Sequence, residues 1–166
     1  VVFKMSGVRF PYTPPLPFSS LWELNLRTYV NYQGKHGIYF FTLDTDHRLG
    51  QWVANNFFSL PYRYKRLAAL VTPHTYNFHA PKSLKLKAHI GGDKVKTDLD
   101  HWLVERYCLF TINKEQAVLR GDVQHQPWML QAANVFEIDD AFSSEFNTPM
   151  DLSKRNCFYA DSLPVR

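Results

Sequence analysis

The chain has 166 residues, of which 45% are hydrophobic and 16% aromatic, and this composition excludes an intrinsically disordered protein. The net charge is only +4 and the Lys and Arg residues are scattered, which is not the signature of a nucleic-acid-binding domain. No apolar run approaches the roughly 20 residues that a membrane-spanning helix needs, and no signal peptide is visible. We therefore expect one cytoplasmic domain over residues 1–166 that binds neither nucleic acid nor membrane.

The first third of the chain alternates strand and connection. Residues 1–10 have strand-like alternation and begin without Met, which predicts that an N-terminal segment is missing. Four prolines then force an extended connection: Pro11, Pro14, Pro15 and Pro17. Residues 22–32 and 38–46 are predicted to form a hairpin, since a short loop with two glycines joins them. An apolar period of three to four predicts a helix over 48–58, with Asp46 as its cap.

The rest of the chain is again rich in short strands. The predicted strands are 62–72, 75–80, 83–90, 107–112, 117–124, 134–139 and 156–160. A helix over 98–106 is predicted to begin at a Thr97 or Asp98 cap, and 140–146 is predicted as a short helix or turn. This pattern predicts an α+β fold that is mainly β, built on a curled antiparallel sheet.

The strand over 22–32 carries the most informative pattern, because its side chains alternate between two faces. One face is apolar. The other presents a carboxylate, an amide, a guanidinium and a phenol, with neighbours roughly 7 Å apart: Glu23, Asn25, Arg27 and Tyr29. Two interpretations stay open. The row is either the solvated face of a half-buried sheet or the polar lining of a ligand pocket.

Familiar catalytic and metal motifs are missing from the sequence. The seven His residues form no His-x-x-x-His pair on a predicted helix, and no Cys-x-x-Cys occurs. Neither a Gly-x-Ser-x-Gly elbow nor a phosphate-binding glycine motif is present. We therefore predict no metal site and no cofactor.

Two further groups remain candidates. Lys65 lies between Arg63 and Arg66, and neighbouring cations favour the neutral amine that imine chemistry requires; the alternative is a solvated basic strand. Arg106 and Tyr107 follow a predicted helix. They either line the cavity of Arg27 and Tyr29, which would suit an anionic ligand, or belong to a structural Glu105–Arg106 ion pair.

Five segments in order resemble the YqjF-like family of uncharacterised bacterial proteins over almost the whole chain: 23–30, 37–44, 60–62, 105–107 and 126–128. That family is similar in fold to acetoacetate decarboxylase, which implies a cone-like barrel around a central pocket, with two or three short helices. In those enzymes a Gly-aromatic-Pro-Lys-Lys motif supplies the imine-forming lysine. Here Tyr62 and Arg63 follow Pro61, so the resemblance implies the fold without that decarboxylation.

The leading hypothesis is a protein that binds a small apolar or aromatic carbonyl or carboxylate compound. The predicted ligand-binding residues are Glu23, Asn25, Arg27, Tyr29, Tyr62, Arg106 and Tyr107. An alternative is an enzyme acting on an oxo acid, with Glu23 and Lys65 as catalytic candidates. A second alternative is an interaction module whose basic strands at 63–66 and 82–87 bind an acidic partner. An exposed sheet edge is also compatible with a homodimer.

Overall fold

The computed structural model describes residues 1–6, 20–146 and 156–161. The predicted proline-rich connection lies outside these residues. Contacts divide the chain into two compact units, Val1–Leu67 with Leu109–Gly121, and Ala68–Cys108 with Asp122–Arg166. Each unit is described by itself below. The prediction of a single domain stays a prediction.

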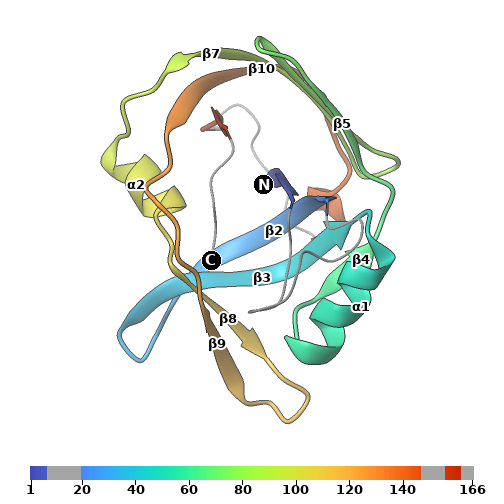
Figure 1. Cartoon of the computed structure of the whole chain (residues 1–166), viewed down its shortest axis with the longest axis vertical. Coiled ribbons are helices and arrows are strands. Elements are labelled where there is room, and N and C mark those ends of the chain that lie inside the picture. Colours follow the sequence, from blue (N-terminus) through green and yellow to red (C-terminus); the bar gives the residue numbers. More distant parts are fainter. Residues whose placement is uncertain (7–19, 147–155, 162–166) are drawn as a thin grey trace. The chain divides into compact units, whose positions relative to one another are not determined.

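The first unit is built on one sheet with the strand order β1-β2-β3-β8-β9, and β4 also pairs with β3 (Figure 1). The strands are β1 (Val2–Met5), β2 (Leu21–Tyr32), β3 (Lys35–Thr45), β4 (Tyr62–Tyr64), β8 (Cys108–Ile112) and β9 (Val118–Asp122). The predicted β2–β3 hairpin is confirmed. Gln33 and Gly34 in its turn have φ values of 49° and 78°. Tight hairpin turns commonly require such positive values, and at Gly34 they carry no steric cost. β4 and β8 both pair with β3 in parallel.

Near its start, β2 is buried on both of its faces. Leu24 on one face and Glu23 and Asn25 on the other are each only 1% exposed. The register with β3 shifts after Leu26, so that Arg27 lies opposite Phe40. A β-bulge of this kind bends a strand and re-aims its side chains. The bulge therefore separates Glu23 and Asn25 from the outer half of the strand.

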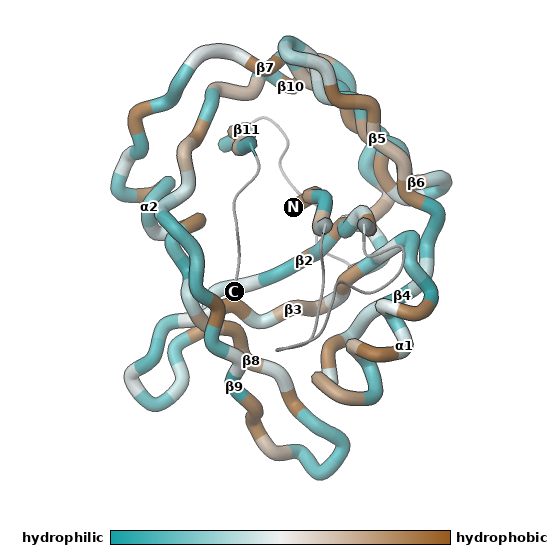
Figure 2. The backbone as a smooth tube through the Cα atoms, in the orientation of Figure 1, coloured by the Kyte–Doolittle hydropathy of each residue, from teal (hydrophilic) through white to brown (hydrophobic). Residues whose placement is uncertain are grey.

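Helix α1 (Arg48–Phe57) matches the predicted helix, but the predicted cap is wrong. His47 is the N-cap, and its Nδ1 accepts a hydrogen bond from the Gly50 N–H at 2.8 Å. The Asp46 carboxylate instead accepts from the backbone N–H of Trp22 on β2, also at 2.8 Å. The Asp46 carboxylate is therefore bonded to strand β2 and does not cap the helix. The apolar stripe of α1 is not buried, since Trp52 remains 56% exposed, and hydrophobic segments are visible along the helix in Figure 2.

The predicted strand over 62–72 is divided in the structure. β4 belongs to the first sheet, whereas β5 (Ala68–Val71) pairs with β6 in the second. Between them the chain leaves the sheet, and Leu67 is buried at 8% exposure. Continuous strand-like composition did not reveal this change of sheet, because pairing partners are non-local.

The second unit contains an antiparallel sheet with the order β11-β10-β7-β6-β5. Its other strands are β6 (Thr75–Ala80), β7 (Leu84–Asp93), β10 (Leu130–Asp140) and β11 (Phe158–Ala160), accompanied by α2 (Asp98–Val104) and the short 3₁₀ helix η1 (Ser143–Phe146). Phe78 and Ala88 are buried on the inner face, at 1% and 3% exposure. Hydrophilic and hydrophobic segments follow one another along these strands (Figure 2), as expected for sheets with one covered face.

The predicted fold class is confirmed. The described residues form two mainly antiparallel sheets with two α-helices. Of the two predicted caps of α2, Thr97 is the one used, through a capping box with Asp100. No helix among the described residues is long and apolar enough to span a membrane.

Candidate functional site

The strongest polar cluster of the first unit joins Glu23, Asn25 and Tyr62. Asn25 Nδ2 donates to Glu23 Oε1 at 2.9 Å, and the Tyr62 hydroxyl donates to Glu23 Oε2 at 2.5 Å. In the sheet register, Asn25 and Tyr62 both lie opposite Leu43, from β2 and β4 respectively. Directly opposed residues share a face of the sheet. The parallel β3–β4 pairing therefore brings Tyr62 to the predicted polar row.

Burial determines the electrostatics of this cluster. Desolvation raises the pKa of the Glu23 carboxyl, while hydrogen bonds from Tyr62 and Asn25 and the charge of Arg27 act in the opposite direction. Desolvation and the Glu23 charge also raise the pKa of the Tyr62 phenol. Tyr62 is thus held as a neutral donor, and Glu23 binds a proton more readily than an exposed glutamate. A buried carboxyl of this kind is suited to acid–base work.

Asn25 has one polar atom left over. Its Oδ1 is buried and has no hydrogen-bond partner among the described residues. A buried acceptor without a partner costs about 1–3 kcal/mol. Turning the amide over would move the unpaired position to Nδ2 without removing it. A ligand group at this position would therefore complete the amide's hydrogen bonding.

Arg27 and Tyr29 form a second pair further along β2. Arg27 Nη2 donates to the Tyr29 hydroxyl at 3.4 Å, and the guanidinium lies 5.7 Å from the centre of the Tyr29 ring. Both residues are half-buried. The predicted row thus consists of a buried Glu23–Asn25 pair and a more accessible Arg27–Tyr29 pair, on either side of the bulge.

Lys65 is brought to a different carboxylate. Its Nζ lies 3.0 Å from Asp44 Oδ2, and Arg63 Nε lies 2.6 Å from Asp44 Oδ1. Asp44 is fully buried and alternates with Leu43 along β3, so it occupies the sheet face opposite to that of Tyr62. The Lys65 amine is thus paired with a carboxylate on the face of the sheet opposite to Tyr62.

Arg106 and Tyr107 belong to the second unit. The Tyr107 hydroxyl donates to Glu105 Oε2 at 2.7 Å, and its ring stacks on His125 at 4.6 Å. The Arg106 guanidinium lies 4.8 Å from the Trp102 ring centre. Glu105 forms its ion pair with Lys96, at 2.6 Å. Burial opposes ionisation of Glu105, but the bonds from Lys96, Tyr107 and the Trp128 N–H together lower its pKa.

The basic strand over 82–87 carries its own counter-charge. Lys85 Nζ and Lys87 Nζ lie 2.5 Å and 2.7 Å from the two oxygens of Glu137 on β10. Exposed pairs such as these contribute little to stability. They do reduce the positive charge that this face offers to an acidic partner. Within the described residues, no three metal-binding side chains come together.

Sequence reasoning missed the residue that holds Tyr62 in place. Asn55 on α1 donates from Nδ2 to the Tyr62 carbonyl oxygen, and its Oδ1 accepts from the Tyr62 N–H, both at 3.0 Å. The Asn55 side chain thus pairs with the backbone N–H and carbonyl oxygen of Tyr62, as a neighbouring strand would. No sequence signal could have identified it, because an asparagine inside a helix has no distinctive local pattern.

Comparisons with known proteins agree with the fold. The chain is 38% identical over 141 residues to the uncharacterized protein YqjF of Bacillus subtilis (strain 168), covering 79% of this chain and 58% of that protein. Among solved structures, acetoacetate decarboxylase from Legionella pneumophila matches 87% of this chain and 61% of its own, with a TM-score of 0.54 at 14% identity. The enduracididine biosynthesis enzyme MppR complexed with pyruvate matches 89% and 61%, with a TM-score of 0.53 at 7% identity.

The structural matches and the family match support different conclusions. At such low identity the two structures show only a shared fold, and the predicted likeness to acetoacetate decarboxylase is confirmed at that level. This chain spans about three fifths of each relative's length, between 58% and 61%. The family model DUF2071, described as an uncharacterized conserved protein, matches residues 1–164 of this chain. The chain therefore belongs to the DUF2071 family.

Proposed function

We propose that the protein binds a small carbonyl or carboxylate compound, with an apolar or aromatic body, at the Glu23–Asn25–Tyr62 cluster. The unpaired, buried Oδ1 of Asn25 is the observation that carries this proposal. Since this atom accepts hydrogen bonds, the ligand must also offer a donor, such as a hydroxyl or enol. The Arg27 guanidinium, further along the same strand, favours an acidic group on the ligand.

The same geometry argues against Schiff-base decarboxylation. Tyr62 occupies the position after Pro61, and a phenol cannot form an imine. Lys65 is paired with the buried Asp44 on the other face of the sheet. Support for an oxo-acid class of ligand comes from MppR, which shares the fold and has been solved with pyruvate.

Binding is tested by thermal shift with pairs of related compounds: pyruvate and lactate, then phenylpyruvate and phenyllactate. A compound that binds only the folded protein raises the melting temperature. Glu23→Gln should weaken binding about tenfold or more, corresponding to about 1.4 kcal/mol. Glu115→Gln makes the same change at an exposed position and should leave binding unchanged. No shift with any of the four compounds, or equal shifts in all three proteins, would contradict the proposal.

A second candidate function is proton transfer next to a carbonyl group. The raised pKa of Glu23 and its short hydrogen bond to Tyr62 favour it, because a carboxyl poised nearer neutrality can take up and return a proton. The measurement is deuterium exchange at the methyl group of pyruvate in heavy water, followed by NMR. Exchange that the wild-type protein accelerates and Glu23→Gln does not would establish this activity. Exchange at the buffer rate in both would leave only binding.

A further inference from the structure

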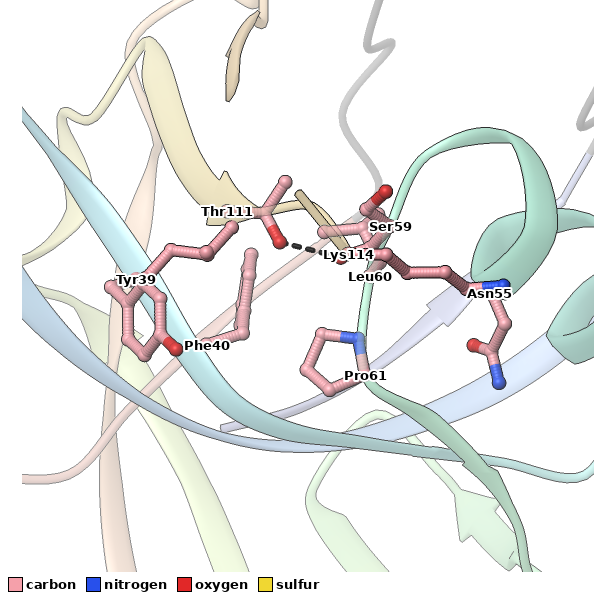
Figure 3. A pocket seen from close by; sticks show the side chains of 9 residues that line it. Tyr39, Phe40, Asn55, Ser59, Leu60, Pro61, Thr111 and Lys114 are labelled. Atoms are coloured by element: carbon pink, nitrogen blue, oxygen red, sulfur yellow. Dashed lines mark hydrogen bonds between the residues drawn. The ribbon is translucent and has the colours of Figure 1, made fainter. Parts of the chain in front are cut away.

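A separate cavity of about 320 Å³ lies in the first unit, between β3, the segment after α1 and the β8–β9 hairpin (Figure 3). Tyr39 and Phe40 lie at one end in this view, Pro61 in the middle, and Asn55 and Lys114 at the other. This volume falls at the lower end of the roughly 300–1,000 Å³ typical of small-ligand sites. None of the residues of the Glu23–Asn25–Tyr62 cluster lines it.

The lining of this cavity combines aromatic and aliphatic surface with several polar side chains and one charge. Tyr39, Phe40 and Leu60 are among its walls, and Lys114 is the only charged residue among the described residues that line it. Two of the other polar side chains are already engaged. The Thr111 hydroxyl donates to the Ser59 carbonyl oxygen at 2.5 Å, and the Asn55 amide is taken up by the backbone of Tyr62. Besides these groups, the lining offers the Lys114 ammonium and the hydroxyls of Tyr39 and Ser59, next to aromatic and aliphatic surface.

The backbone at the cavity wall is strained. Ser59 has φ 52°, in the left-handed region of backbone conformation that residues other than glycine rarely adopt. The bond from Thr111, 52 residues away in sequence, holds its carbonyl oxygen in place. Strained residues that the surrounding structure holds in this way are concentrated at ligand-binding and switch regions. The strain is an observation independent of the shape and charge of the cavity.

We propose that this cavity is a second small-molecule site, and that it takes a monocarboxylate with a flat apolar body. The carboxylate pairs with Lys114, and the apolar body lies against Tyr39, Phe40 and Leu60. Lys114 is the cation of this site, and no acidic residue stands among the lining residues. A ligand with a single negative charge therefore complements the site. This site is independent of the function proposed for Glu23, which does not line the cavity.

The probe for this site is phenylacetate, and its uncharged counterpart phenylacetamide is the control ligand. Titration into ¹⁵N-labelled protein should move the backbone amide signals of Ser59, Leu60 and Ile112. Lys114→Glu should weaken phenylacetate binding about tenfold or more, as loss of an ion pair and introduction of a like charge require. Lys35→Glu makes the same charge change at another exposed position of the first unit and should change the affinity less than about twofold.

A second variant tests the cavity itself. Ile112 lines the cavity and is 45% exposed, so Ile112→Trp should fill the space without disturbing the core, and should abolish the signal changes. Three results would overturn the proposal. They are no movement of these signals, equal binding of acid and amide, and movement confined to residues 23–29, which would place the probe at the other site.

Discussion

The hydroxyl of Tyr62 donates a 2.5 Å hydrogen bond to Glu23 Oε2, from a strand that lies 39 residues further along the chain. This bond joins the predicted polar row of β2 to the residue that replaces the expected lysine after Pro61. It also opposes the effect of burial on the Glu23 carboxyl. Several measurable properties of the protein depend on this contact.

Removal of the phenol in Tyr62→Phe should raise the pKa of Glu23 further, because the bond that Tyr62 donates lowers it. The free energy of unfolding should fall by about 1–3 kcal/mol, as for other hydrogen bonds to buried charged groups. The pKa is measured by ¹³C NMR of the carboxyl group, and stability by urea unfolding. Tyr64→Phe is the matched control, since that side chain is 37% exposed. Equal effects of the two changes would contradict a special role of Tyr62.

The raised pKa of Glu23 predicts a definite pH dependence of stability. The folded protein holds this proton more tightly than the unfolded chain, whose Glu value is 4.5. Stability from this group is therefore full below that value and is lost as pH rises through the folded pKa. A tenfold tighter hold on the proton corresponds to about 1.4 kcal/mol of stability. Urea unfolding between about pH 4 and pH 8 should show wild type losing stability relative to Glu23→Gln. A difference that is independent of pH would refute the assignment.

Asp100 should show the opposite sign. This fully buried residue accepts hydrogen bonds from Lys94, from the Thr97 N–H at 2.9 Å and from Asn156 at 2.8 Å. The Lys94 bond is the largest cause of its lowered pKa. Stability from Asp100 is thus present above the unfolded value of 3.8 and lost as pH falls through the lower folded pKa.

The variant Asp100→Asn tests this sign. It should destabilise the second unit strongly at neutral pH, by about 3–5 kcal/mol, since it leaves Lys94 without its partner. The loss should shrink as pH falls toward the folded pKa, which thermal unfolding at several pH values would measure. Asp98→Asn, at an exposed position of the same helix, should cost less than about 1 kcal/mol. A cost of Asp100→Asn that grows on acidification would contradict the prediction.

Asn55 is predicted to act as a positioning residue for Tyr62. Asn55→Ala leaves the N–H and the carbonyl oxygen of Tyr62 without their side-chain partner, so stability should fall by about 1–3 kcal/mol. Ligand affinity at the Glu23 cluster should fall with it, and the ¹³C shift of the Glu23 carboxyl should change. Asn56→Ala removes only an exposed bond to the Trp52 carbonyl oxygen and is the matched control. Unchanged Glu23 signals in Asn55→Ala would rule out the positioning role.

Imine formation should fail on this protein. Because Lys65 Nζ is paired with the buried Asp44 carboxylate, incubation with pyruvate or acetoacetate and borohydride should leave the protein mass unchanged. Asp44→Asn provides the contrast, since it removes the carboxylate that pairs with Lys65. An adduct mapped to Lys65 in the wild-type protein would restore the Schiff-base mechanism.

The sequence alone determined features that depend on local periodicity. Alternation predicted the hairpin of 22–32 and 38–46, the three-to-four-residue period predicted α1, and Thr97 was one of the two caps predicted for α2. The same alternation placed Glu23 and Asn25 together on one strand face. Residues two apart on a strand must share a face, so these features required no knowledge of the rest of the fold.

Tertiary structure decided everything that depends on pairing between distant segments. Parallel pairing of β3 with β4 brought Tyr62 to Glu23 and Lys65 to Asp44, and a one-residue change of register would have exchanged these faces. The bulge after Leu26 divided the polar row. Burial, not residue type, raised the pKa of Glu23. The local sequence of a strand does not specify which other strand pairs with it. That pairing determines the chemistry of this site.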